Sequence, residues 1–198
     1  MFPIIPANSV TAASGNQEGI FGFGYATLSM TNLVSNAGVV SSDVTGVGTG
    51  RGYLAACEYG GDKGIFAYGA TSGGYDLVSM SNLVSNAGVV ATDVTGVGTA
   101  RRAPAACSYG EDKGIFGYGD TGSYVSMTNL VSNAGVVGTD VTGVGTVRRY
   151  PAACEYGEDK GIFGYGDAAA AKYSMTNLVS NAGVVATDTT GVGTARGY

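Results

Sequence analysis

Short apolar runs separated by glycine-rich turns recur along the chain, and they predict β-strands. In the segment 104–148, the run Pro-Ala-Ala-Cys-Ser-Tyr-Gly comes before a polar turn at 111–113, and the apolar run Gly-Ile-Phe-Gly-Tyr-Gly follows that turn. Two such runs around a short polar turn are typical of a β-hairpin. Residues 126–133 and 136–148 supply a third and a fourth strand around the turn Asn133-Ala134-Gly135. Glycines inside the fourth run predict that the outermost strand is irregular.

This pattern occurs four times. The phrase Thr-Asn-Leu-Val-Ser-Asn-Ala-Gly-Val-Val, with Ser for Thr in the second copy, begins at Thr31, Ser81, Thr128 and Thr176, so the spacings are 50, 47 and 48 residues. A strand-type repeat of that length is typical of a propeller or a solenoid. We therefore expect an all-β domain over residues 10–198, a β-propeller of four four-stranded blades of about 48 residues each. An open β repeat array is the alternative, and residues 1–9 are expected to form an extended apolar arm.

The order of residues within each unit resembles a degenerate kelch-type blade. The order is an arginine, a run of small residues, a Tyr-Gly turn and a Gly-Ile-Phe run that ends on glycine, as in 101–119. Two features depart from kelch blades: Gly-Tyr-Gly stands where a double glycine is expected, and the chain has no tryptophan. The resemblance covers all four units and implies the blade topology.

Composition excludes several classes of protein. Glycine makes up 35 of 198 residues, yet 44% of residues are hydrophobic and only 4 are proline, which argues against a disordered or collagen-like chain. The net charge of -5 without a basic cluster argues against binding to nucleic acid. We expect no insertion into a membrane, because no run approaches about 18 apolar residues. The start, Met1 to Ser9, lacks a basic segment and contains two prolines, so it does not read as a secretory signal.

Cysteine usage indicates unpaired thiols. Cys57, Cys107 and Cys154 each lie six residues after a recurrent arginine, and Ala12 occupies the matching place in the first unit. Three equivalent positions cannot all pair within one chain, and alanine at the fourth indicates a small buried side chain. We expect free thiols and assembly in a reducing compartment.

Enzyme chemistry finds little support in the sequence. The chain has no histidine and no Cys-x-x-Cys pair, which argues against the common acyl-transfer triads and against zinc. The glycine-rich runs lack the lysine and the following helix of a phosphate loop. A glycosidase needs a pair of carboxylates, for which the candidates are Asp76, Asp120 and Asp167. Each of them stands alone in its segment without an evident partner, so the pair is only a formal possibility. We expect no enzyme activity, no catalytic residue, no metal and no cofactor. The recurrent Asp and Arg, such as Asp93 and Arg101, are interpreted as structural pairs.

Differences between the units are confined to two connections. The distance from the Gly-Ile-Phe run to the following asparagine varies as 13, 18, 15 and 16 residues, and a second variable patch follows each recurrent arginine. In an up-and-down blade both connections lie on the same face, and loops on a rigid scaffold commonly carry binding. The competing explanation is that the sequences of these connections differ only because nothing selects them. The large or charged residues there are the predicted partner-binding residues: Tyr75, Tyr124, Tyr173, Arg102 and Arg149.

Two resemblances point to a virus particle. The start Met-Phe-Pro-Ile-Ile-Pro-Ala-Asn-Ser is similar to the N-terminal segments of bacteriophage virion proteins, and the repeats are similar to arrays in phage tail or fibre proteins. They imply a non-enzymatic structural or binding protein of the virion, assembled in the host cytoplasm, on the tail or capsid. Its partners would be other virion proteins, copies of itself, or a host-surface glycan. A stand-alone glycan-binding module and a subunit of a self-assembling filament are the alternatives.

Overall fold

The computed structural model describes residues 17–24 and 28–197. The predicted arm, residues 1–9, and Ala12 lie outside these residues. We number the repeats by the arginine that ends each one: repeat 1 ends at Arg51, and repeats 2, 3 and 4 cover 52–101, 102–148 and 149–196. The described part of the chain contains β-strands, one short 3-10 turn and no α-helix, so the all-β prediction is confirmed.

The strands follow the repeats. Repeat 1 contains β1 (Gly19–Gly24) and β2 (Leu28–Val34). Repeat 2 contains β3 (Ala55–Tyr59), β4 (Lys63–Ala67), β5 (Ala70–Thr71), the 3-10 turn η1 (Ser72–Gly74), β6 (Asp76–Leu77) and β7 (Ser81–Val84). Repeat 3 contains β8 (Ala105–Tyr109), β9 (Lys113–Asp120) and β10 (Tyr124–Val131). Repeat 4 contains β11 (Ala152–Tyr156), β12 (Lys160–Gly164), β13 (Asp167–Ala168), β14 (Ala171–Lys172) and β15 (Thr176–Val179).

Repeats 2, 3 and 4 each form a three-stranded antiparallel sheet with the Gly-Ile-Phe strand in the centre. The sheet orders are β3-β4-β7, β8-β9-β10 and β11-β12-β15, while the described part of repeat 1 pairs β1 with β2. The predicted fourth strand is not a strand in any repeat. It pairs with the third strand through isolated bridges such as Thr128↔Val141 and through single hydrogen bonds such as that from Asn129 to Gly138. Glycines at 143 and 145 explain this, because the Cβ of any other residue at 143 would collide with Ser126, and 145 has a φ of +77°.

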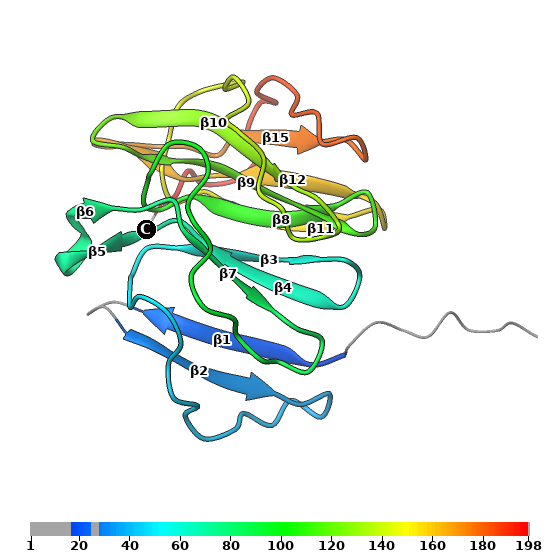
Figure 1. Cartoon of the computed structure of the whole chain (residues 1–198). Helices are drawn as coiled ribbons and strands as arrows, with labels where there is room; N and C mark the ends of the chain where they lie inside the picture. The colour runs from blue at the N-terminus through cyan, green and yellow to red at the C-terminus, as the bar shows by residue number, and fades with distance from the viewer. Residues whose placement is uncertain (1–16, 25–27, 198) are drawn as a thin grey trace, which may run out of the picture.

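The sheets stack on one another in chain order, from β1–β2 at one end to β11–β12–β15 at the other (Figure 1). The Gly-Ile-Phe strand supplies an aromatic ring to each junction between repeats. The pairs are Phe23–Phe66, Tyr68–Phe116 and Tyr118–Phe163, with ring centroids 5.2, 5.4 and 5.2 Å apart. Tyr68 and Tyr118 have φ of 64° and 65°, a left-handed conformation that is uncommon for tyrosine. The core is therefore a series of interfaces between neighbouring sheets.

The arginine that ends each repeat is buried in the junction to the next one. Arg51, Arg101 and Arg148 have 0% exposure. The Arg101 guanidinium lies 3.9 Å from the ring centre of Tyr68 in its own repeat and donates from Nε to the carbonyl of Tyr118 in the next, at 2.9 Å. Arg51 and Arg148 make the same Nε bond to Tyr68 and Tyr165, at 2.8 Å. A buried guanidinium needs such acceptors, so the arginine fixes two repeats relative to each other.

A threonine two residues before that arginine binds the recurrent aspartate of the next repeat. Thr49 donates its backbone N–H to both carboxylate oxygens of Asp93, at 3.1 and 3.0 Å, and its hydroxyl at 2.7 Å. Asn82 donates to the same carboxylate at 2.9 Å. Thr99 with Asp140 and Thr146 with Asp188 repeat this contact. The structural interpretation of the recurrent aspartate thus agrees with its contacts.

All three cysteines are free, as predicted, but they are not all buried. The Sγ atoms of Cys57 and Cys107 face Gly114 and Gly161 of the next repeat. Burial raises the pKa of both thiols, that of Cys107 to about 12. Cys154 is exposed, which contradicts the expectation of a buried side chain at this position. The reason is that no described sheet packs against Cys154, whereas Cys57 and Cys107 face the sheet of the next repeat.

Candidate functional site

The two variable connections of the chain meet at one edge of the stack. Bridges join the segment after each recurrent arginine to the segment after the Gly-Ile-Phe strand of the same repeat: Gly52↔Ala70, Arg102↔Asp120 and Arg149↔Asp167. The expectation that both variable regions share one side therefore agrees with the structure. In Figure 1 the β5–β6 hairpin projects from this edge, away from the turns between the first and second strands.

Two arginines and two aspartates form a network along this edge. Arg102 binds the Asp120 carboxylate with Nε and Nη2, at 3.2 and 3.1 Å. Arg149 donates from Nε to Asp167 at 3.0 Å and lies 3.5 Å from Asp120, so Asp120 links repeats 3 and 4. The carboxylates are buried and the arginine side chains are 28% exposed. The charges balance within the network, which therefore has no strong net field.

Aromatic rings surround Arg149. Its guanidinium lies 5.4 Å from the ring centre of Tyr124 and 5.2 Å from that of Tyr150. Tyr53, from repeat 2, packs against Tyr150 with centroids 6.3 Å apart. The pKa of Arg149 is raised above its ordinary value, mainly by its hydrogen bond to Asp167, so the guanidinium stays cationic. We refer to these residues as the loop-edge cluster: Tyr53, Arg102, Asp120, Tyr124, Arg149, Tyr150 and Asp167.

The structure brings three of the five predicted partner-binding residues into this cluster, namely Arg102, Tyr124 and Arg149. Tyr75 lies next to it, because the carbonyl of Gly74 accepts a hydrogen bond from Nη1 of Arg102. Tyr75 is 83% exposed, whereas Tyr124 and Tyr173 are only partly exposed. Tyr173 donates its backbone N–H to the carbonyl of Gly166 and accepts a bond from the N–H of Arg196, and neither residue belongs to the cluster. The sequence-based selection missed Tyr53 and Tyr150, although both stand in the variable patch after the arginine.

The carboxylates of the cluster are engaged in ion pairs. Asp120 and Asp167 are held by arginines, so neither serves as an unpaired acid or base, and Asp76 is exposed in the β5–β6 hairpin. Within residues 17–24 and 28–197, no three His, Cys, Asp or Glu side chains are grouped as a metal site would require. None of the described segments forms a helix that is long and apolar enough to cross a membrane.

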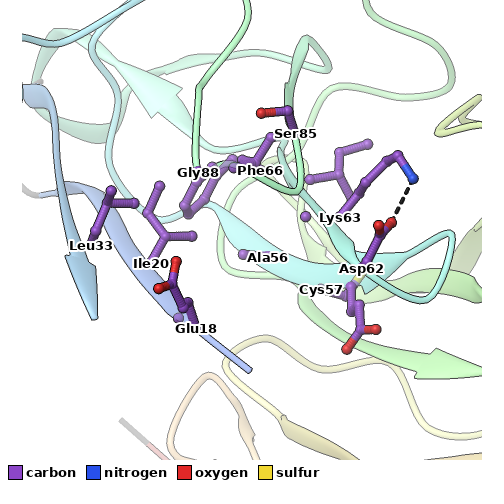
Figure 2. A pocket seen from close by; sticks show the side chains of 15 residues that line it. Glu18, Ile20, Leu33, Ala56, Cys57, Asp62, Lys63, Phe66, Ser85 and Gly88 are labelled. Carbon is purple, nitrogen blue, oxygen red and sulfur yellow. Dashed lines mark hydrogen bonds and ion pairs between the residues drawn. The ribbon is translucent and has the colours of Figure 1, made fainter. Parts of the chain in front are cut away.

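A pocket of about 260 Å³ lies between the sheets of repeats 1 and 2 (Figure 2). Apolar side chains of Ile20, Leu33 and Phe66 line it, and the ion pair of Lys63 with Asp62 lies at one side. At the next junction Cys57 on β3 faces Gly114 of repeat 3. The segment that aligns with β3 in repeat 1 is 9–15, which lies outside the described residues. We therefore assign no ligand to this pocket.

No family model matches the chain, and no curated protein matches it. Solved structures do match, among them one titled "Structure of YjhT", with a TM-score of 0.56 and 12% sequence identity. The match covers 77% of this chain and 49% of that one, so the chain spans about half the length of the solved structure. At this identity the likeness concerns the fold alone.

Proposed function

We propose that the protein is a non-enzymatic structural and binding module of a bacteriophage particle. In this proposal the repeats are kelch-like propeller blades, and the loop-edge cluster contacts a partner, either another virion subunit or the host surface. The observation that carries it is the location of the variable residues. Large or charged groups that differ between repeats gather on one edge of a scaffold whose other contacts repeat from unit to unit.

The cluster is suited to binding because it is pre-organised. Asp120 holds both arginines, and tyrosine rings flank Arg149, so little side-chain freedom remains to be lost when a partner binds. The described contacts of Arg102 use three of the five N–H groups of a guanidinium. Tyrosine and arginine are also the residues that contribute most often to binding hot spots.

The experiment uses purified particles of the source virus. The protein should be present in them in a fixed ratio to the other structural proteins, measured by quantitative mass spectrometry. Deletion of residues 1–9 should abolish incorporation while the purified protein stays folded. Tyr75→Ala combined with Arg149→Lys should weaken partner contact, with Val89→Ala, an exposed change outside the variable connections, as the control. Absence of the protein from particles would refute the virion assignment.

A second candidate, a glycan-binding module, is favoured by the arrangement of Tyr150, Arg149 and Asp167. Tyrosine rings offer apolar faces with polar edges, and Arg and Asp supply hydrogen bonds of the kind that sugar hydroxyls use. A glycan array tests this directly. Two results together would favour this function over the first. The protein would bind a glycan specifically and lose that binding in Tyr150→Ala, and it would be absent from purified particles.

A further inference from the structure

The two ends of the stack carry the two halves of the contact that joins every internal pair of repeats. At each junction the earlier repeat contributes threonine, arginine, leucine and an aromatic ring. The later repeat contributes aspartate, a backbone carbonyl, glycine and phenylalanine. Repeat 4 has no described sheet after it, and repeat 1 has none before it (Figure 1). We call these surfaces the outer face of repeat 4 and the outer face of repeat 1.

The outer face of repeat 4 exposes groups that are buried in the other repeats. Tyr156 is 38% exposed, whereas its equivalents Tyr59 and Tyr109 are 4% and 3% exposed. Arg196 is exposed, although Arg51, Arg101 and Arg148 are fully buried, and its guanidinium already lies 3.6 Å from the ring centre of Tyr165. Arg196 is thus stacked on its own repeat as the internal arginines are. The internal arginines donate to a carbonyl of the following repeat, and no described repeat supplies that carbonyl to Arg196.

The outer face of repeat 1 shows the complementary half. Phe21 is 64% exposed, whereas Phe66, Phe116 and Phe163 are at most 4% exposed. Val40 is likewise exposed while Val90 and Val137 are buried. A Cβ on Gly88, Gly135 or Gly183 would meet a leucine of the preceding repeat within 3.0 Å, but one on Gly38 meets no described atom within 4 Å.

Groups on one face can be paired with groups on the other by analogy with the internal junctions. The internal contacts predict five pairs: Thr194 with Asp43, Arg196 with the carbonyl of Phe23, Tyr165 with Phe21, Leu178 with Gly38, and Cys154 with Gly19. The faces match in chemistry as well as position, because a hydroxyl meets a carboxylate, a guanidinium meets a carbonyl, and rings meet rings. An unrelated partner would have to reproduce all five.

We propose that a second copy of this chain binds there, with the outer face of repeat 4 of one copy seated on the outer face of repeat 1 of the next. The two faces lie at opposite ends of the stack (Figure 1), so their contact joins different copies. Such a head-to-tail interface gives a ring if the rotation closes and a filament if it does not. This inference deepens the part of the proposed function that concerns contacts between copies, and it does not involve the loop-edge cluster.

A designed disulfide tests the register. Cys57 and Cys107 have their Sγ atoms 2.6 Å from the position of a Cβ on Gly114 and Gly161, so Gly19→Cys should place a thiol against Cys154 of a second copy. Among the described residues, a Cβ on Gly19 would meet Val34 alone, at 3.5 Å or more, so they leave room for a side chain there. Mild oxidation of the variant should give covalent species with the mass of two or more chains. Gly19→Cys combined with Cys154→Ala is the control and should give none.

The unmodified protein should also associate reversibly, measured by sedimentation over a concentration series. Phe21→Asp should weaken association by about 30-fold or more, the effect of losing a hot spot. Val136→Asp, at a residue that is also 64% exposed but lies in repeat 3, should leave association unchanged. Circular dichroism should show both variants folded. A protein that stays a single chain at all concentrations, or a disulfide that forms within one chain, would overturn the proposal. The outcome does not depend on the loop-edge variants or on the particle assay. The proposal of head-to-tail association can therefore be refuted independently of the proposed function.

Discussion

The two edges of the stack differ in how far their contacts repeat. At the edge with the turns between first and second strands, Asp62, Asp112 and Asp159 each bind the adjacent lysine and an asparagine of their own repeat. Backbone bonds from Gly60 to Asp112 and from Gly110 to Asp159 link these turns across the junctions. At the opposite edge each repeat has its own hairpin and its own charges. At the first edge the same contact joins repeats 2 and 3 and repeats 3 and 4, whereas at the second edge the side-chain contacts between repeats differ from one junction to the next.

The strongest test of this comparison is a charge in the constant core. Phe116 is fully buried between repeats 2 and 3, so Phe116→Asp buries an unpaired carboxylate at a cost of several kcal/mol, against a typical total stability of about 5–15 kcal/mol. We expect the variant to be unfolded by circular dichroism. Val136→Asp in the same repeat should change stability by less than about 0.5 kcal/mol. A folded Phe116→Asp protein would mean that the rings do not hold the repeats together.

A smaller effect is expected from the threonine–aspartate contact. Asp140→Ala removes the acceptor for Thr99 and Asn129 and should destabilise the fold by about 2–3 kcal/mol in chemical denaturation. Asp43 bonds Asn32 in the same way, but no repeat before it is described. Asp43→Ala should therefore cost less than about 1 kcal/mol, the value of an ordinary exposed hydrogen bond. If Asp140→Ala and Asp43→Ala lose equal stability in dilute solution, the contact with the preceding repeat does not contribute to the stabilising effect of Asp140.

The same carboxylates predict how stability depends on pH. Burial alone raises the pKa of Asp93, Asp140 and Asp188, but hydrogen bonds from threonine and asparagine outweigh burial and lower it. A lowered folded-state pKa gives stability that is present above the unfolded value of about 3.9 and lost as the pH falls through the folded value. The denaturation midpoint should be level from about pH 6 to 5 and decrease below about pH 4. Asp140→Asn should make that decrease less steep. An unchanged decrease below about pH 4 would show that this carboxylate is not a cause of the pH dependence.

The smallest effect should come from the variable edge. Deletion of Ser72 to Gly74 removes part of the β5–β6 hairpin, and Arg102 keeps its bonds to Asp120 when it loses the Gly74 carbonyl. Stability should change by less than about 1 kcal/mol, because shortening an exposed loop has little entropic effect. Deletion of the equally long segment 85–87 at the constant edge is the matched control. It removes the Ser85 bonds that shape the turn, so its denaturation midpoint should be lower.

Much of the fold could be predicted from the sequence. Periodic spacing located the hairpin, the central Gly-Ile-Phe strand and the variable connections, because each depends on contacts within one repeat. The burial of Phe116 and the free thiols follow from the same reasoning. The loss of the fourth strand could be anticipated only in part, since glycine signals irregularity but does not say how much pairing survives.

The positions that sequence reasoning missed depend on contacts between repeats. Arg101 lies between an aromatic ring of one repeat and a carbonyl of the next, and no spacing within one repeat reveals that. The sequence contexts of Cys154 and Cys107 are alike and predict the same environment, yet of these two residues only Cys107 faces a described sheet of a following repeat. Half-burial of Tyr124 has a similar cause, since its neighbour Arg149 comes from the next repeat.

The stacking of near-identical sheets also has a mechanical consequence. If the two ends of the chain are pulled apart, the weakest element is the sheet with a single neighbour, so force should remove repeats one by one from an end. Each released repeat of about 48 residues would add about 170 Å of extended chain. A force–extension trace would then show evenly spaced drops, and the protein would behave as an extensible link of uniform steps.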